Sequence, residues 1–110
     1  MADLELLQGT LDVLVLKTLT WGPRHGYAVA RWIKETTDGG IAVEDRALYV
    51  CLHRLEERGL IAADWGVSAN NRKAKYYQLT AKGRRTLAAK TEEFSSYAAA
   101  VFKVLRAAEA

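Results

Sequence analysis

The spacing of apolar residues predicts two helices in the first third of the chain. From Leu4 to Leu19, leucines recur at intervals of three and four residues, as on one face of a helix. Because Gly9 weakens the first turn, we expect the firm helix to begin near Thr10 and to end at Trp21-Gly22-Pro23. A second helix is expected from about His25 to Thr37. The residues on its apolar side are Tyr27, Ala30 and Ile33.

The same spacing predicts a third helix at the centre of the chain. It follows a short extended piece, Ile41-Ala42-Val43, and Glu44 or Asp45 is expected to cap it, since a carboxylate accepts free backbone N–H groups there. Gly59 is expected to be the left-handed residue that follows its last turn. Leucines four and three residues apart place one face in the core. This buried stripe consists of Leu48, Leu52 and Leu55.

Two runs with strand character follow the third helix. They extend from Leu60 to Val67 and from Lys73 to Leu79. Asn70-Asn71 lies between them, where a turn needs residues that adopt left-handed or side-chain-bonded conformations. Tyr76 and Tyr77 are adjacent in the second run, so we expect one of them in the core and the other exposed.

A long last helix is expected from Ala81 to about Ala108, with Thr80 as its cap. Its stripe repeats in steps of four and three, as in a heptad pattern. The stripe comprises Leu87, Thr91, Phe94, Ala98, Val101 and Leu105, widened by Tyr97 and Phe102. A helix of roughly 28 residues would be ~42 Å long, longer than so small a domain can cover. We therefore expect the stripe to meet a second copy of the chain across a two-fold axis.

This order of elements predicts a mainly α fold with a two-stranded β-hairpin. We interpret residues 1–80 as a winged helix-turn-helix and residues 81–110 as a C-terminal dimerisation helix of the same structural unit. A chain of 110 residues is long enough for one domain with a modest core. Its content of 50% hydrophobic and 26% charged residues is typical of a globular protein.

The distribution of charge changes this picture more than the net charge of +3. From Gly66 to Lys90 the chain contains no Asp or Glu, whereas acids occur near its N-terminus. Such a local field favours a polyanion near the hairpin, and a solvated basic loop without a partner is the alternative. The basic residues of this stretch are Arg72, Lys73, Lys75, Lys82, Arg84, Arg85 and Lys90.

A winged helix-turn-helix presents its third helix and its hairpin to DNA, and the N-terminal part of that helix reads the bases. An arginine there can fork onto guanine, and a valine can touch a thymine methyl group. The candidates on the helix are Arg46, Tyr49, Val50, His53 and Arg54. Alternatively, Tyr49 lies at the edge of the core and Arg46 is a solvated neighbour of the cap. At the hairpin tip, Arg72, Lys73 and Lys75 suit contacts to phosphate or the minor groove.

Little in the sequence supports catalysis, a metal site or a cofactor. His25 and His53 are expected on different helices, with no paired acids, nucleophile motif or metal-ligand spacing around them. Cys51 is expected to be a small buried residue, with a redox role as the alternative. A single cysteine permits no internal disulfide, no apolar run approaches the ~20 residues of a membrane span, and the acidic N-terminus does not look like a signal peptide. We therefore expect a cytoplasmic protein that does not bind a membrane.

The leading hypothesis is a DNA-binding transcriptional regulator. A winged-helix module that binds protein through Trp32, Trp65 or the long helix, without direct DNA contact, is the first alternative. An enzyme is the second, and the lack of a convergent polar site argues against it.

The chain resembles the PadR family of bacterial transcriptional regulators, in its short form with a single C-terminal helix. The resemblance rests on four motifs: LLQGTLDVLVLKTL, WGPRHGYAVARWI, LYVCLHRLEERGLI and SANNRKAKYYQLTAKGRR. It implies a homodimeric winged helix-turn-helix that usually represses transcription, with the hairpin as wing and the first and last helices as dimer contacts. The interface residues expected on this basis are Leu7, Leu11, Leu87, Phe94, Tyr97, Ala98, Val101, Phe102 and Leu105.

The third helix departs from the family pattern in one place. Relatives usually have leucine-tyrosine-proline-alanine there, whereas Val50 and Cys51 follow Leu48 and Tyr49 in this chain. Arg46 also replaces a frequent glycine, so the sequence allows an operator that differs from that of relatives. Some relatives release DNA when an aromatic compound binds at the dimer interface. The residues that would line such a pocket here are Phe94, Tyr97 and Phe102, with plain dimer core as the alternative.

Overall fold

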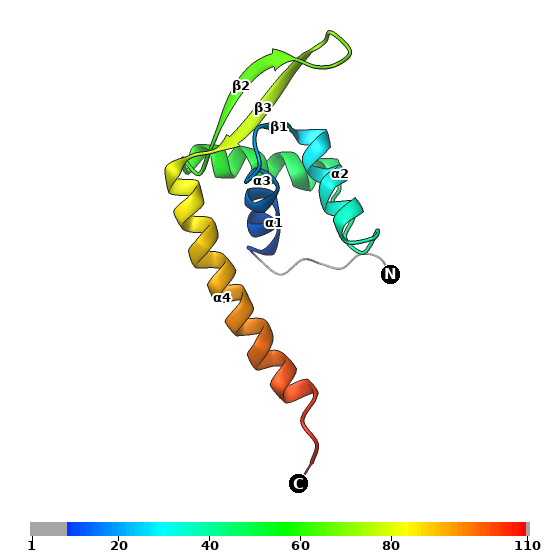
Figure 1. Ribbon diagram of the computed structural model, residues 1–110, viewed down its shortest axis with the longest axis vertical. Helices are drawn as coiled ribbons and strands as arrows, with labels where there is room; N and C mark the ends of the chain where they lie inside the picture. Colours follow the sequence, from blue (N-terminus) through cyan, green and yellow to red (C-terminus); the bar gives the residue numbers. More distant parts are fainter. Residues whose placement is uncertain (1–8, 110) are drawn as a thin grey trace.

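The computed structural model of the protein describes residues 9–109 of its 110. Three helices form the body, a hairpin extends from one end of it, and the last helix runs away from the other side (Figure 1). The elements in chain order are α1 (Thr10–Thr18), β1 (Arg24–His25), α2 (Gly26–Thr36), α3 (Asp45–Glu57), β2 (Ile61–Val67), β3 (Lys73–Leu79) and α4 (Ala81–Leu105). This is the winged helix-turn-helix arrangement with the long C-terminal helix that the sequence predicts.

The sheet has three strands rather than the two predicted. β3 lies in the middle, paired with β2 on one side and with the two-residue strand β1 on the other. Arg24 pairs with Tyr77 and His25 with Tyr76, so the start of α2 is tied to the wing. The prediction missed β1 and placed His25 in the second helix, because two residues after Pro23 are too few to produce a recognisable alternation.

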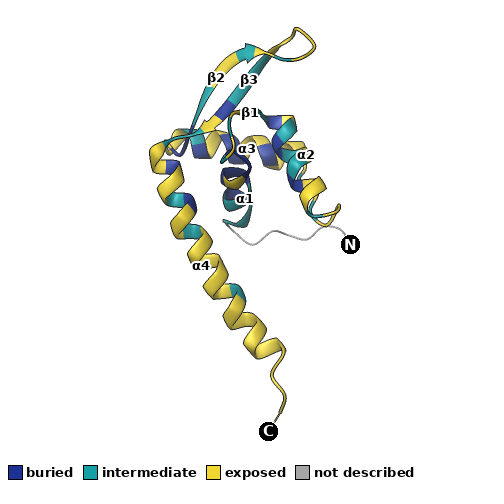
Figure 2. Ribbon diagram, viewed as in Figure 1, coloured by how far each residue is buried: buried dark blue, intermediate teal, exposed yellow. Residues whose placement is uncertain are grey.

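The core lies where α1, α2 and α3 meet beneath the sheet, and its side chains are buried (Figure 2). The predicted leucine stripe of α3 is confirmed, since Leu48, Leu52 and Leu55 are fully buried. In α2 the prediction is confirmed for Ile33, which is buried, and Ala30 is partly buried against the core. Tyr27, however, is 62% exposed, and Val29 faces the core in its place. The remaining buried hydrophobic residues are Val15, Leu16, Leu19, Cys51, Leu60, Ile61, Tyr77 and Leu87.

The ends of α3 and the start of α4 show which predicted caps form. Gly59 has φ +76°, its N–H donates to the carbonyl of Glu56, and the next N–H, of Leu60, donates to Leu55, both at 3.0 Å. This pair of bonds satisfies the last carbonyls of α3, as predicted. The hydroxyl oxygen of Thr80 accepts from Gly83 N–H at 2.9 Å, which confirms the cap of α4.

One prediction at the start of α3 is wrong. Glu44 is the residue before α3, but neither its carboxylate nor that of Asp45 caps the helix; only the Glu44 carbonyl accepts, from Leu48 N–H at 2.9 Å. Residues 41–43, which were expected to be a short extended piece, lie in neither a helix nor a strand. They belong to an irregular connection, in which the N–H of Ile41 donates to the Thr37 hydroxyl at 3.0 Å.

Helix α4 contributes to the core only near its start. Its buried residues are Gly83 and Leu87, and beyond them the helix is largely exposed (Figure 2). Leu87 is therefore a core residue of its own chain, and its prediction as a dimer contact is corrected. No helix within residues 9–109 is both long enough and apolar enough to cross a membrane.

The other predicted dimer residues are placed as follows. Leu11 is half-buried against the core, Ala98 is half-buried, and Leu7 lies outside the described residues. The five that remain exposed are Phe94, Tyr97, Val101, Phe102 and Leu105.

Candidate nucleic-acid interface

The side of α3 opposite its leucine stripe is open to solvent. Arg46, Tyr49, Val50 and His53 all project from it, and together with Asp45 they line a shallow depression. Val50, although apolar, is 55% exposed, so an apolar contact is available on a polar surface. The four candidates from the first half of α3 are thus brought together on one face.

Tyr49 connects this face to α2. A Cβ atom on Gly26 would lie 2.7 Å from the Tyr49 hydroxyl oxygen, so the phenol ring rests against the first residue of α2. The ring is still 48% exposed. Tyr49 therefore combines the two roles that sequence reasoning kept as alternatives, packing at the edge of the core and access to a ligand.

The charged members of this face differ in their partners. His53 Nε2 lies 3.4 Å from Glu57 Oε2, and both side chains are well exposed. Within residues 9–109, no carboxylate lies within ion-pair distance of Arg46, so neither Glu44 nor Asp45 holds it away from the surface. Among the described residues, Arg46 is thus an unpaired cation beside Val50.

The wing carries two exposed cations at its tip. Arg72 and Lys73 are exposed, and the turn before them is closed by the N–H of Asn71 donating to the Ser68 carbonyl at 2.9 Å. Asn71 has φ +60°, the left-handed conformation expected of it.

Lys75 does not lie at the tip, contrary to prediction. It is two residues further along β3, opposite Trp65, and the alternation of the strand places it on the same face as buried Tyr77. Its Nζ lies 3.4 Å from Glu56 Oε1 and 5.6 Å from the Tyr77 ring centroid. Lys75 is therefore held against α3.

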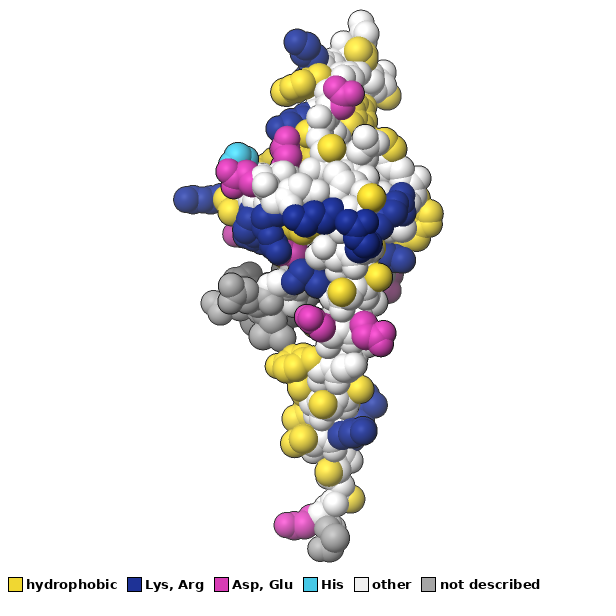
Figure 3. All heavy atoms as spheres, turned by 90° about the vertical axis from the view of Figure 1, so that its left-hand side faces the viewer, with side chains coloured by type: hydrophobic (Ala, Val, Ile, Leu, Met, Phe, Trp, Pro, Cys, Tyr) yellow, Lys and Arg dark blue, Asp and Glu magenta, His cyan; other side chains and the backbone are white. Residues whose placement is uncertain are grey.

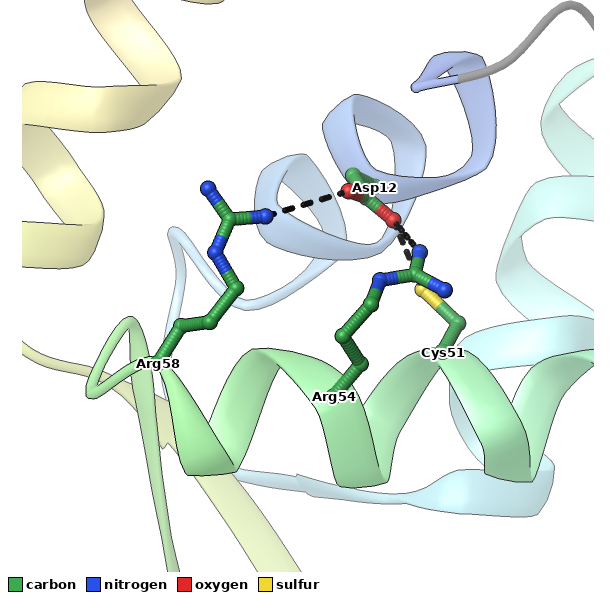
Figure 4. Close-up of polar contacts among 4 residues, drawn as sticks. All are labelled: Asp12, Cys51, Arg54 and Arg58. Atoms are coloured by element: carbon green, nitrogen blue, oxygen red, sulfur yellow. Dashed lines mark hydrogen bonds and ion pairs between the residues drawn. The ribbon is translucent and has the colours of Figure 1, made fainter.

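Arg54 is also engaged inside the protein, as Figure 4 shows. Its guanidinium pairs with Asp12 Oδ1, and Arg58 Nη1 lies 3.8 Å from Asp12 Oδ2. The Cys51 thiol donates to Asp12 Oδ1 at 3.3 Å. Arg54 was predicted to touch DNA, but a buried carboxylate directs it toward α1.

Cys51 is buried, as predicted, and its thiol is expected to be unreactive at neutral pH. Burial first, then the hydrogen bond to Asp12 and the charge of Asp12, raise the pKa of the thiol from 9.0 to about 12. Sequence reasoning counted Asp12 only as one of several N-terminal acids. Its position among apolar residues, in LDVLVL, was the signal that it needs a buried partner.

A band of Lys and Arg side chains crosses the side of the molecule where α3 ends and α4 begins (Figure 3). Lys82 Nζ donates to the Arg58 carbonyl at 3.0 Å, which suits the negative end of the α3 dipole. Arg84 and Arg85 are exposed and, within residues 9–109, have no ion-pair partner. Basic charge therefore continues beyond the wing.

A cleft of about 360 Å³ separates α1 from the middle of α4. Two of the three residues predicted for a ligand pocket, Phe94 and Tyr97, line it. Phe102 is not among its lining residues and instead packs under the Arg106 guanidinium, 4.3 Å from its ring centroid. The other lining residues are Gly9, Thr10, Val13, Lys90 and Glu93.

Comparisons with known proteins agree on one family. The family model for the transcriptional regulator PadR-like family matches residues 15–89. The chain is similar to a solved PadR family transcriptional regulator of Eggerthella lenta, with 34% identity, a TM-score of 0.76, and coverage of 92% of this chain and 86% of that one. It is also similar to a transcriptional regulator of Clostridium thermocellum, with 27% identity, a TM-score of 0.80, and coverage of 87% and 93%.

Proposed function

Because this chain belongs to the PadR-like family of transcriptional regulators, we propose that it represses transcription as a homodimer on an inverted-repeat DNA operator. The observation that supports this most directly is the open face of α3, where Arg46, Tyr49, Val50 and His53 project together. A helix face of this kind beside a basic-tipped hairpin suits the major groove and the neighbouring backbone.

In the proposed complex the N-terminal half of α3 enters the major groove. Arg46 donates to the O6 and N7 acceptors of a guanine, and Val50 contacts a thymine methyl group. Arg72 and Lys73 at the wing tip contact phosphates or the minor groove, which fixes the position of the protein without reading sequence. Arg54 and Lys75, which pair with Asp12 and Glu56, are left out of this contact set.

The proposed dimer forms through the exposed half of α4. Phe94, Tyr97, Val101, Phe102 and Leu105 form an apolar surface on a helix that has left the body of its own chain. Burying each such side chain in a partner is worth roughly 1.5–3 kcal/mol. A two-fold dimer would place the two α3 helices on half-sites about one helical turn, ~10 bp, or a multiple of it apart.

A small aromatic inducer is the finer part of the proposal. The α1–α4 cleft offers Phe94 and Tyr97 as aromatic walls and Lys90 and Glu93 as polar ones. Its size suits a small ring compound. Titration of the purified protein with simple phenolic compounds, followed by operator release, tests this part; release by none of them, at millimolar concentration, counts against it.

The DNA-binding proposal is tested by selecting DNA from a random pool with the purified protein. We expect an inverted repeat, and an affinity that falls steeply with salt. Failure to enrich any sequence, together with salt-independent binding, would favour the alternative of a protein-binding module. That alternative is supported by Trp65, which is 63% exposed on β2.

Variants in the wing and in α3 distinguish the proposed phosphate contacts from the proposed base contacts. Arg72→Ala with Lys73→Ala should weaken binding to all DNA and reduce the salt slope by ~1 per lost phosphate contact in each subunit. Arg46→Ala should instead lower discrimination between operator and random DNA by ~1–3 kcal/mol. Lys34→Ala with Lys103→Ala removes the same charge as the wing pair from the ends of α2 and α4 and should change neither quantity. Unchanged discrimination in Arg46→Ala removes this residue from the reading surface.

A further inference from the structure

Asp12 is the only charged side chain buried within residues 9–109, at 5% exposure. It belongs to α1, and its polar partners are Cys51 and Arg54 of α3 and Arg58, which directly follows α3 (Figure 4). Arg54 and Arg58 are one helical turn apart, so the two oxygens of one carboxylate are approached from two levels of α3. The contact therefore constrains both the rotation and the sliding of α3 against α1.

The same helix, α1, forms one wall of the cleft that it shares with α4. Thr10 and Val13 line that cleft from α1, opposite Lys90, Phe94 and Tyr97. Since α1 has only nine residues, a displacement at its cleft side must carry Asp12 with it. α1 thus lies between the α4 helix and the proposed DNA-reading helix.

The ionic contact restrains α3 in a way that the apolar core does not. Leucine stripes attract without direction, so α3 could slide or turn slightly with little loss of apolar contact. A carboxylate that loses its cations in a buried site is costly, and this cost rises as the pair separates. When α1 moves, α3 should follow rather than leave Asp12 unpaired.

We infer that Asp12 is a positioning residue: acting through Arg54 and Arg58, it sets the orientation of α3 against α1 and α4 and couples the cleft to the DNA-reading face. The inference rests on the proposed DNA-binding function. It also explains why Arg54 and Arg58 pair with Asp12 rather than being available to DNA phosphates. When Asp12 is replaced by an uncharged residue, the half-exposed Arg54 and Arg58 can attract the phosphates of any DNA, whether or not it contains the operator sequence.

Asp12→Asn tests the inference, because it keeps the shape and the hydrogen-bond acceptor but removes the charge. We expect operator selectivity over random DNA to fall about tenfold, while affinity for random DNA stays equal or rises. Simple loss of folded protein would lower both affinities together. Glu92→Gln on the exposed surface of α4 makes the same charge change without touching α3 and is the control.

A second pair of variants guards against misfolding. Arg54→Gln with Arg58→Gln alters two side chains about half exposed and keeps amide N–H groups that can donate to Asp12; near-ultraviolet circular dichroism checks that this variant is folded before its selectivity is measured. Selectivity should fall as in Asp12→Asn, without the rise in random binding. The triple variant should be no worse than the double, since residues that act as a unit are not additive. Additive losses, or unchanged selectivity in every variant, would overturn the inference.

A measurement without DNA separates failure of this inference from failure of the proposed function. Spin labels at Ala47→Cys on α3 and Ala88→Cys on α4, diluted with unlabelled chain, report the distance between the two helices within one chain. The native Cys51 stays unlabelled because it is buried. Asp12→Asn should broaden or shift this distance and Glu92→Gln should not. If both leave it unchanged, the coupling is wrong even where the wild-type protein selects an operator; if it shifts although no operator is selected, only the proposed function fails.

Discussion

The two halves of α4 have the same kind of sequence pattern and opposite surroundings. In the first half, Thr80 caps the helix, Gly83 packs against the Leu60 carbonyl and Leu87 lies in the core. In the second half, Phe94, Val101 and Leu105 are exposed, although they continue the same stripe. A continuous apolar stripe can therefore belong to the fold of its own chain in one part and await an external partner in another.

The largest effect should come from Gly83→Ala in the first half. An added Cβ would lie 2.0 Å from the Leu60 backbone oxygen, so α4 would have to move away from the body. Overpacking against rigid backbone costs about 3 kcal/mol, measured by urea unfolding at fixed protein concentration. Ser95→Ala introduces the same residue in the second half and should stay within ~0.5 kcal/mol of the wild type. Equal free energies of unfolding for Gly83→Ala and Ser95→Ala would contradict the proposed difference in packing between the two halves of α4.

The next effect concerns association rather than folding. Val101→Asp with Leu105→Asp should weaken the dimer at least about a hundredfold in Kd, because each copy loses two side chains worth roughly 1.5–3 kcal/mol each when buried, while the winged-helix body stays folded. Sedimentation at micromolar concentration measures the association, and the near-ultraviolet circular dichroism of the core checks the fold. Ser96→Asp with Lys103→Asp places two aspartates on the other side of the same helix and should remain dimeric. A dimer that persists in the first variant would place the interface elsewhere.

Thr80→Ala should have a smaller effect, again in the first half. The Thr80 hydroxyl accepts from Gly83 N–H at 2.9 Å and donates to the Gly59 carbonyl at 2.7 Å. Loss of such a cap costs ~1 kcal/mol, or a decrease in Tm of roughly 4–8 °C. Thr91→Ala is the matched change, since its hydroxyl only bonds back to the Leu87 carbonyl of the same helix. Such bonds add little to stability, so its Tm should be nearly unchanged.

The smallest effect concerns the rate at which the Cys51 thiol reacts, and it is measured in the folded wild-type protein. Cys51 should react very slowly with a disulfide reagent at pH 8, because it is buried and its pKa is raised to about 12. A cysteine introduced at exposed Ala88 should react at once, and one at Ala98, on the apolar stripe, should react more slowly only when the partner helix covers it. Fast reaction of Cys51 in the folded protein would contradict its burial.

The pKa of Cys51 also sets a direction for alkaline stability. The folded protein keeps this proton where the unfolded chain, with a pKa near 9.0, loses it. The contribution is therefore complete below pH 9 and is lost as the pH rises toward 12. Cys51→Ala should reduce the dependence of Tm on pH in that range, measured by circular dichroism. Tyr77, whose pKa burial also raises, should leave part of the decline in place.

Elements whose signals are local were predictable from the sequence. Gly59 and Thr80 act through bonds to residues within a few positions, and the α3 leucines repeat within one helix. What depended on distant partners was not predictable. The sequence around Lys75 does not predict its ion pair with Glu56, and the sequence around Arg54 does not predict its ion pair with Asp12. Which side of α2 is exposed depends on how the three helices pack together. Leu87 is a further example, because the apolar stripe of α4 does not show which of its residues pack in the core of their own chain and which lie beyond it.

The two-residue strand β1 has a consequence for the order in which the molecule folds. β2 and β3 are joined by a short turn, so their pairing closes quickly. The pairing of Arg24 with Tyr77 closes a loop that contains α2, α3 and the hairpin, and such non-local closure is entropically unfavourable until the intervening chain is compact. We therefore expect the hairpin and helices to assemble first and β1 to join last. Because β1 leads directly into α2, α2 and α3 would then reach their final positions relative to the wing only in this last step.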